Sequence, residues 1–348
     1  MTMTRREPEI LVVGTSRCMP SRLIAAELQR RRADFLLLDL AEFGDVGVDV
    51  RIDVAHDDDD VQITRIHSGE TISLRRVRSL YAREIDPLAT AWQLDPRRAP
   101  VVLTDVAARI QKRTVIAFIR TILHLLQDRC YTLLPHAPTQ IASSKLLQLA
   151  LARELGMRVP ETLITGDKKA LRAFVNNHPR VVAKPFAPMS FALDMQEYRT
   201  WTSIVDVDDI DALHDAAEPL CLQEAILPKT DLRVGVIGRH VIAAEMSSDD
   251  DGGIVDFRAT SLACLAAHEK IGARIVTLPD LVTSRVVEFT RRLGLQYAMI
   301  DLLRRDDGEI VFLEANPHGM FGELRQAGHD PVGLIADVLI DPATQALT

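Results

Sequence analysis

Two short apolar runs near the C-terminus, separated by a strong turn signal, constrain the fold of this chain more than any other part of its sequence. The runs cover residues 298–303 and 310–313, and the stretch between them contains Asp307-Gly308. Asp-Gly between two apolar, strand-like runs is typical of a β-hairpin with a two-residue turn. The sequence therefore predicts two antiparallel strands, and the turn decides which of their residues face each other.

The predicted hairpin brings two acidic side chains together. A two-residue turn places Asp301 directly opposite Glu314, and Asn316 lies two residues further along the same face. Opposite side chains lie roughly 5 Å apart, and like charges at that distance repel. A divalent cation removes the repulsion, and oxygen-only ligands suit a hard ion such as Mg²⁺, which proteins usually hold together with nucleotide phosphates. These three residues are therefore candidate ligands of a metal–nucleotide site; the alternative is an exposed hairpin with scattered acids.

Composition excludes several classes of function. The 348 residues are enough for two or three domains. A formal net charge of −8 argues against nucleic-acid binding, and the apolar runs are too short to cross a membrane. No signal peptide is evident, and the 4 cysteines show no Cys-x-x-Cys spacing, so we expect a cytoplasmic protein without a zinc site or a disulfide framework.

Strand and helix patterns alternate along the N-terminal region. Apolar runs at 9–14 and 34–39 flank a helix opened by Pro20, which predicts a βαβ start as in a Rossmann-like layer. The loop at 14–18 lacks the Gly-x-Gly-x-x-Gly pattern, so the sequence argues against dinucleotide binding. A long amphipathic helix follows, and its predicted apolar face consists of Val115, Phe118, Ile119, Ile122, Leu125 and Leu126.

The second half of the chain places charged residues at the ends of predicted elements. A helix follows Ser143-Ser144-Lys145, and an apolar strand ends at Lys184. Another strand leads into Gln223-Glu224, and a hairpin turns at Gly238. On its own, a lysine at the end of a strand is more simply a solvated charge, and an isolated arginine is more simply part of a surface ion pair.

Taken in order, the charged motifs of the second half resemble those of the ATP-grasp ligases over about residues 135 to 340. The motifs are Lys145, Ala183-Lys184-Pro185, Gln223-Glu224, Asp231-Leu232-Arg233, Asp256-Phe257-Arg258, Ile300-Asp301 and Glu314-Ala315-Asn316. More narrowly, the chain resembles the graspetide maturases, the microviridin-type and TgmB-like ligases that cross-link ribosomal peptides. Those ligases usually carry Asp-Trp-Arg where this chain has Asp256-Phe257-Arg258, and Pro-x-Gly-Gln where it has Pro317-His318-Gly319-Met320.

The resemblance implies a fold class and a domain organisation. The fold class is α/β (α+β ATP-grasp). A Rossmann-like pre-ATP-grasp domain is expected over residues 1–134, a central ATP-grasp subdomain over 135–220 and a C-terminal catalytic subdomain over 221–348.

The resemblance also implies roles for individual residues, with ATP and Mg²⁺ as cofactors. Lys145 and Lys184 are expected at the α- and β-phosphates. Gln223, Glu224, Ala225 and Ile226 are expected to form a hinge that holds adenine through backbone groups, with Lys229 or Asp231 near the ribose. Arg233 and Arg258 are expected to stabilise the transferring phosphate and the acyl oxyanion, where the fork geometry of arginine helps. Asp301, Glu314 and Asn316 are expected to hold Mg²⁺.

Three functions remain open at this point. The first is an ATP-dependent ligase, a homodimer by resemblance, that joins Asp or Glu side chains of a precursor peptide to Ser or Thr hydroxyls or to Lys amines. Its partner is the leader and core of that peptide, with no nucleic acid and no membrane. The second is a RimK-type carboxylate–amine ligase that adds an amino acid to a small molecule or a protein tail. The third is a non-catalytic ATP-binding scaffold, which the complete set of charged positions disfavours.

Overall fold

The computed structural model describes residues 5–14, 18–40, 48–52, 60–66, 68–83, 106–184, 190–193, 196–199, 202–213, 218–247 and 272–347. Predicted residue Arg258 lies outside these ranges. None of the helices within them combines the length and the apolar character that a membrane span requires.

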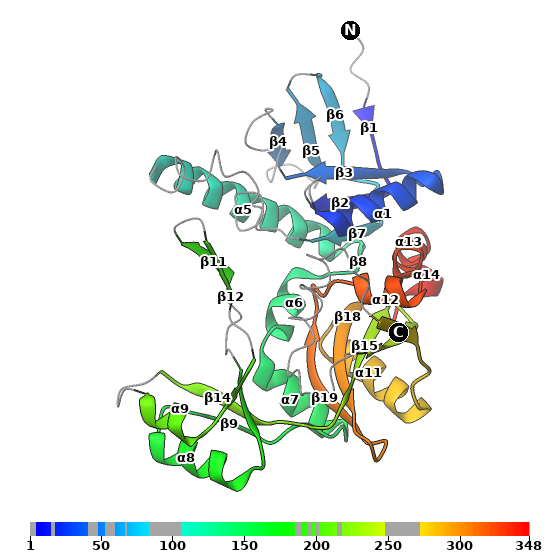
Figure 1. The fold of residues 1–348 in the computed structure, drawn as a ribbon. Coiled ribbons are helices and arrows are strands. Elements are labelled where there is room, and N and C mark those ends of the chain that lie inside the picture. The colour runs from blue at the N-terminus through cyan, green and yellow to red at the C-terminus, as the bar shows by residue number, and fades with distance from the viewer. Residues whose placement is uncertain are drawn as a thin grey trace.

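The N-terminal part contains a parallel sheet with the strand order β3-β2-β7-β8 (Figure 1). Its elements are β2 (Ile10–Gly14), α1 (Met19–Arg30), β3 (Phe35–Asp39), β7 (Ser79–Ala82) and β8 (Tyr131–Thr132). The predicted βαβ start is therefore confirmed. Every residue of β2 is buried, because side chains on its two faces enter two different hydrophobic cores.

The long helix α5 (Val106–Gln127) packs against this sheet, but with a slightly different face from the predicted one. Leu125 is 45% exposed, whereas Leu123 is buried. The buried stripe follows the i, i+3, i+7 spacing from Ile119 through Ile122 to Leu126, and Leu123 lies beside it at i+4. A second sheet adds to the same core, with the order β1 (Arg5–Arg6), β6 (Glu70–Ser73), β5 (Val61–Arg65) and β4 (Val48–Ile52).

The middle of the chain forms a small sheet with the order β13-β10-β14-β9. Its elements are α6 (His136–Ala142), α7 (Lys145–Glu154), β9 (Thr162–Thr165), α8 (Lys168–Asn177), β10 (Val181–Lys184), β13 (Ser203–Val205), α9 (Val207–Ala212) and β14 (Leu220–Glu224), with the separate hairpin β11 (Ser190–Leu193) and β12 (Gln196–Arg199). Leu171 of α8 and Ile210 of α9 pack on one face of the sheet. The opposite face is left for the functional site described below.

The C-terminal part is an antiparallel sheet with the order β17-β16-β15-β18-β19. Its elements are β15 (Thr230–Ile237), β16 (His240–Ser247), β17 (Gly272–Ile275), α11 (Asp280–Arg292), β18 (Tyr297–Arg304), β19 (Ile310–Asn316), α12 (Gly322–Ala327), α13 (Pro331–Ile340) and α14 (Pro342–Gln345). One face packs on α7 and α11 through residues such as Val234, Ile300 and Phe289. On the other face, Tyr297 and Met299 share a core with α13 and with the N-terminal sheet.

The turn of the predicted hairpin differs from the two-residue turn expected at Asp307-Gly308. The loop consists of residues 306–308 and is closed by a hydrogen bond of 2.9 Å from the Arg305 backbone N to the Glu309 O. Gly308 has a φ of 86°, the left-handed conformation that the third residue of such a loop requires. The two-residue turn was therefore wrong, because Asp306 also belongs to the loop.

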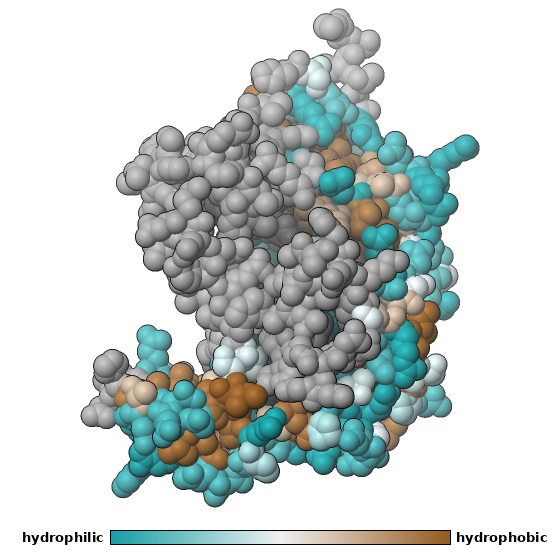
Figure 2. Space-filling model, viewed as in Figure 1, coloured by the Kyte–Doolittle hydropathy of each residue, from teal (hydrophilic) through white to brown (hydrophobic). Residues whose placement is uncertain are grey.

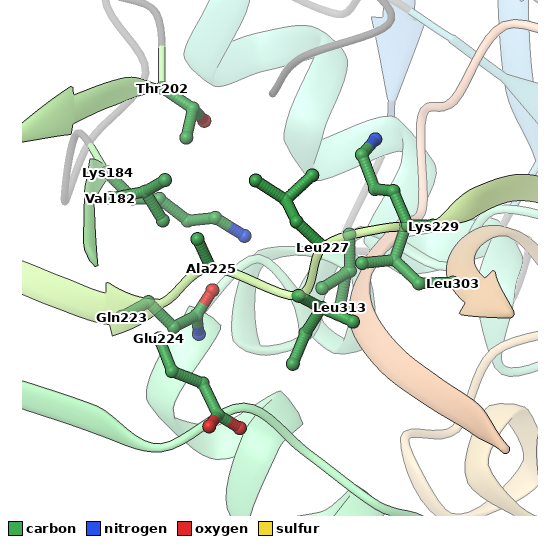
Figure 3. A pocket seen from close by; sticks show the side chains of 11 residues that line it. Val182, Lys184, Thr202, Gln223, Glu224, Ala225, Leu227, Lys229, Leu303 and Leu313 are labelled. Atoms are coloured by element: carbon green, nitrogen blue, oxygen red, sulfur yellow. The ribbon is translucent and has the colours of Figure 1, made fainter. Parts of the chain in front are cut away.

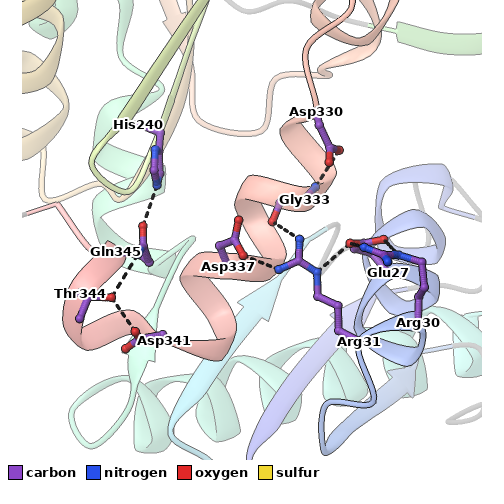
Figure 4. Close-up of polar contacts among 10 residues, drawn as sticks. All are labelled: Glu27, Arg30, Arg31, His240, Asp330, Gly333, Asp337, Asp341, Thr344 and Gln345. Atoms are coloured by element: carbon purple, nitrogen blue, oxygen red, sulfur yellow. Dashed lines mark hydrogen bonds and ion pairs between the residues drawn. The ribbon is translucent and has the colours of Figure 1, made fainter.

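An ion-pair network ties helix α1 to helix α13 (Figure 4). Arg31 donates to Asp337 and, at 3.2 Å, to the Gly333 carbonyl of α13. It also bonds Glu27 at 2.7 Å, and Arg30 and Arg31 together lower the pKa of Glu27 to about 2. Since α1 belongs to the N-terminal sheet and α13 covers the C-terminal sheet, this network holds the two parts of the molecule together.

Candidate active site

A β-bulge in β19 places the predicted acidic pair. Asp301 lies directly opposite Glu314, as predicted, and the pairing shifts by one residue between Asp301 and Leu302. The extra residue is Leu313, which has no partner in the pairing. The directions of the neighbouring side chains show how it interrupts the alternation of the strand. Phe312 and Ala315 both enter the core under the sheet, so Leu313 and Glu314 are left together on the opposite face. The bulge therefore presents an apolar and an acidic side chain side by side.

Two basic side chains offset the charges of this pair. Arg233, directly opposite Asp301 in the neighbouring strand, donates from Nη1 to Asp301 Oδ1 at 2.6 Å. Both side chains are buried, so each neutralises a charge that would be costly to bury alone. Lys145, the first residue of α7, places Nζ 3.6 Å from Glu314 Oε2. The two acids thus lie beside cations from two different elements, β15 and α7.

Asn316 ends β19 on the same face, and its side chain shapes the turn that follows. Its Oδ1 accepts a hydrogen bond of 2.9 Å from the His318 backbone N. Within the described part of the chain, no group of three or more His, Cys, Asp or Glu side chains could hold a metal ion. The predicted set of Asp301, Glu314 and Asn316 has two carboxylates and one amide, which is the oxygen chemistry that suits Mg²⁺. These residues fit a hard cation that is shared with phosphates better than a site built of protein ligands alone.

A pocket, partly open to solvent, has lining residues from both strands that carry the acidic pair (Figure 3). Its lining residues are Val182, Lys184, Thr202, Gln223, Glu224, Ala225, Ile226, Leu227, Lys229, Leu303 and Leu313. Six of these, namely Lys184, Gln223, Glu224, Ala225, Ile226 and Lys229, were predicted to bind the nucleotide. The predicted residues Lys145 and Asp231 are not part of the lining.

The charged side chain of the predicted hinge is directed away from the pocket. Figure 3 shows the Glu224 carboxylate pointing away from the pocket. That carboxylate accepts hydrogen bonds from Arg158 and, at 3.1 Å, from the Glu161 backbone N. Lys229 Nζ bonds both carboxylate oxygens of Asp231, at 2.7 and 2.5 Å, so these two residues form a partly buried ion pair at the edge of the pocket.

Lys145 and Lys184 converge on one place from two elements. Cys221 lies directly opposite Lys184 in the neighbouring strand. Burial raises the pKa of the Cys221 thiol, while the positive charges of Lys145 and Lys184 both act to lower it. Lys184 lines the pocket, and Lys145 lies beside Glu314, so two positive charges are available there to stabilise phosphate groups.

The apolar walls of the pocket were not predicted. Leu303 follows Asp301 by two residues on the same strand, so strand alternation could have identified it. Leu313 could not be identified, because only the bulge turns it to this face. Figure 2 shows apolar side chains gathered in the region of the small sheet that carries Val182. Flat apolar walls with a few polar groups are typical of sites that bind an aromatic ring.

Gln148 is a further residue that the sequence did not reveal. It lies one turn after Lys145 in α7, and its side chain is 2% exposed. Its Oε1 accepts from the Ala315 backbone N at 2.8 Å, and its Nε2 donates to the Ala315 carbonyl at 2.7 Å. Ala315 stands between Glu314 and Asn316 on the edge strand β19. Gln148 therefore bonds the edge strand as a further strand would. In this way it holds the two predicted ligands next to Ala315, namely Glu314 and Asn316.

Replacing Gln148 with Leu is expected to lower the free energy of unfolding and to loosen strand β19, which carries Glu314 and Asn316. The change leaves the buried backbone groups of Ala315 without these hydrogen bonds, which costs about 1–3 kcal/mol of unfolding free energy. Urea denaturation measures this loss, and Gln140→Leu, an exposed glutamine on the neighbouring helix α6, is the matched control. Equal stability of the two variants would show that Gln148 does not anchor β19.

Comparisons with known proteins bear on the fold of this chain. No family model matches the sequence. A curated relative, a probable alpha-L-glutamate ligase of Enterobacter sp. (strain 638), is 29% identical over 198 residues, which is 55% of this chain and 61% of that protein. The matched region thus spans less than two thirds of the relative.

Two solved structures resemble the whole chain. The macrocyclase MdnC of Microcystis aeruginosa MRC, bound with the precursor peptide MdnA, has a TM-score of 0.78 at 22% identity, over 96% of this chain and 99% of MdnC. The ATP-grasp ligase PsnB, complexed with a phosphomimetic variant of a minimal precursor, Mg and ADP, has a TM-score of 0.72 at 22% identity, over 97% of this chain and 100% of PsnB. The predicted fold class is therefore confirmed, and this chain has the ATP-grasp fold.

Proposed function

We propose that this protein is an ATP-dependent ligase that cross-links a ribosomal precursor peptide. In the proposed reaction, an Asp or Glu side chain of the peptide is activated as an acyl phosphate. A Ser or Thr hydroxyl then attacks it to give an ester, or a Lys amine to give an amide. The observation that carries the proposal is the pocket that brings the predicted adenine hinge together with Leu303 and Leu313, from the two strands that carry the facing carboxylates, in a fold shared over nearly its full length with precursor-bound proteins.

The residues of the site divide into three proposed tasks. The backbone at 223–226 and the leucines of the pocket hold the adenine, with Lys229 and Asp231 at the ribose end. Lys145 and Lys184 bind phosphate oxygens. Asp301, Glu314 and Asn316 hold Mg²⁺, which when bound neutralises phosphate charge during transfer.

Arg233 is proposed to serve the reaction by holding Asp301 in place, since its side chain is buried and bonded to that carboxylate. The positive charge of Arg233 also stabilises the negative charge of a phosphoryl group nearby. A catalytic role for Arg258 stays a prediction, because this residue lies outside the described part of the chain.

A mass-spectrometric assay tests the proposal. The enzyme is incubated with ATP, Mg²⁺ and a short precursor peptide, rich in Thr and Glu or Asp, encoded next to its gene. The expected product has lost the mass of one water for each cross-link, and ADP accumulates in proportion. Unchanged peptide mass with every neighbouring precursor would contradict the proposal.

The similarity to a probable alpha-L-glutamate ligase favours a second candidate, a RimK-type carboxylate–amine ligase. In the same assay, this activity would add the mass of an amino-acid residue to an acceptor instead of removing water. A non-catalytic scaffold would bind ATP and change no mass.

Three accompanying properties are also proposals. The enzyme acts as a homodimer, which light scattering would test, and it resides in the cytoplasm with its leader and core peptide as partner. The domain boundaries at 134/135 and 220/221 remain predictions.

A further inference from the structure

The segment that follows Asn316 is held by side chains from three separate strands. Arg233 of β15 donates from Nη2 to the Met320 carbonyl at 2.8 Å. Tyr297 of β18 donates from its hydroxyl to the Gly319 carbonyl at 2.6 Å. Arg83, directly after β7 of the N-terminal sheet, completes the set. Arg83 belongs to the N-terminal part of the chain, which has no role in the function proposed above.

Arg83 is almost fully buried, at 3% exposure, and its guanidinium group serves this segment. Its Nη2 donates to the His318 carbonyl and, at 3.2 Å, contacts the Met320 sulfur, while Nη1 donates to the Gly319 carbonyl at 3.4 Å. Burying a charged group is costly unless it makes hydrogen bonds, and here the fork of donors ends on successive main-chain groups. A buried arginine placed in this way fixes the backbone of 318–320.

The backbone of this segment in turn fixes Asn316. The His318 N donates to Asn316 Oδ1 at 2.9 Å, and the Gly319 N donates to the Asn316 carbonyl at 2.9 Å. The segment also meets Arg233, which holds Asp301. A shift at 318–320 would therefore move two of the three proposed metal ligands.

We propose that Arg83 is a positioning residue of the phosphate-transfer site, supplied by the N-terminal sheet. It acts through residues 316–320, and it sets the position of Asn316 and of the Arg233–Asp301 pair. This inference rests on the proposed function, because it assigns the segment to the metal–nucleotide site. Sidechains that orient metal ligands in this way typically change metal affinity or activity about 10–100-fold when they are replaced.

Three variants test the proposal: Arg83→Met, Arg83→Lys and the control Arg31→Met. Arg31, at the end of α1, also joins the two parts of the molecule and also donates to a backbone carbonyl, but its partners are in α13 and not in the segment 318–320. We expect Arg83→Met to lower kcat about 10–100-fold and to raise the Mg²⁺ concentration for half-maximal rate, with the KM for ATP changed less than about twofold. Arg83→Lys should recover part of the rate, and Arg31→Met should keep the wild-type Mg²⁺ dependence.

Hydrogen–deuterium exchange gives a readout that does not depend on turnover. In Arg83→Met the backbone amides at 316–321 should exchange faster than in the wild type, whereas Arg31→Met should leave them unchanged. An Arg83→Met enzyme with wild-type Mg²⁺ dependence and wild-type exchange at 316–321 would overturn the proposal. If the wild-type enzyme modifies no peptide, the proposed function fails. In that case the role of Arg83 is still decided by two other measurements. Calorimetry measures the affinity of each variant for Mg²⁺ in the presence of ADP, and hydrogen–deuterium exchange measures the protection of 316–321.

Discussion

Replacing Glu314 with Gln is expected to abolish peptide cross-linking while the protein stays folded. Gln keeps the shape of the side chain and removes its charge, so the facing pair with Asp301 loses one of its two negative charges. Replacing even a residue that only orients a metal ligand costs about 10–100-fold, so loss of a ligand itself should cost at least roughly 100-fold in turnover. The measurement is the rate of water loss from the precursor by mass spectrometry, at several Mg²⁺ concentrations.

The control for this change lies in the same hairpin. Glu309 is exposed beside the turn, so Glu309→Gln makes the same chemical change outside the site and should keep the wild-type rate. Far-ultraviolet circular dichroism should be the same for both variants. Full activity of Glu314→Gln at every Mg²⁺ concentration would show that the metal assignment is wrong.

The acidic pair shows how a correct prediction can rest on an incorrect detail. The loop is one residue longer than the predicted turn, which alone would have moved Glu314 out of register with Asp301. The bulge at Leu313 adds a residue to the same strand and restores the pairing. Turn composition identifies a hairpin well, but bulges follow from packing on both faces of a sheet. The sequence alone therefore could not place Leu313 in the pocket.

Residues at the ends of strands could be picked out from the sequence, whereas residues that act across the molecule could not. Lys184 and the run 223–226 follow from apolar strands that end in polar residues, and they line the pocket as a group. Gln148 and Tyr297 carry no local signal, because their partners are 167 and 22 residues away along the chain. Arg83 was recognised as the end of a strand, but its contacts lie 235 and 236 residues further on. Such long-range contacts depend on how the two sheets pack together.

Replacing Gly319 with Ala should be the most damaging small change in this segment. A Cβ atom at Gly319 would lie 2.3 Å from Met299 Cβ and 3.0 Å from Arg233 Nη2. Since Met299 Cβ is fixed to the sheet, the segment itself must move away. The hydrogen bonds that Arg83 and Tyr297 donate to its backbone carbonyls then lengthen. We expect a loss of about 1–3 kcal/mol in the free energy of unfolding, which is typical of overpacking.

Gly322→Ala provides the comparison for this experiment, because an added Cβ there meets nothing within 4 Å. Its unfolding free energy should stay within about 0.5 kcal/mol of the wild type, and its turnover should be unchanged. Gly319→Ala should also need more Mg²⁺ for half-maximal rate, since displacement of 318–320 carries Asn316 with it. Chemical denaturation and Mg²⁺ titration of the two variants separate the effects. If Gly319→Ala lost stability but kept its Mg²⁺ dependence, the segment would pack the sheet without positioning the ligands.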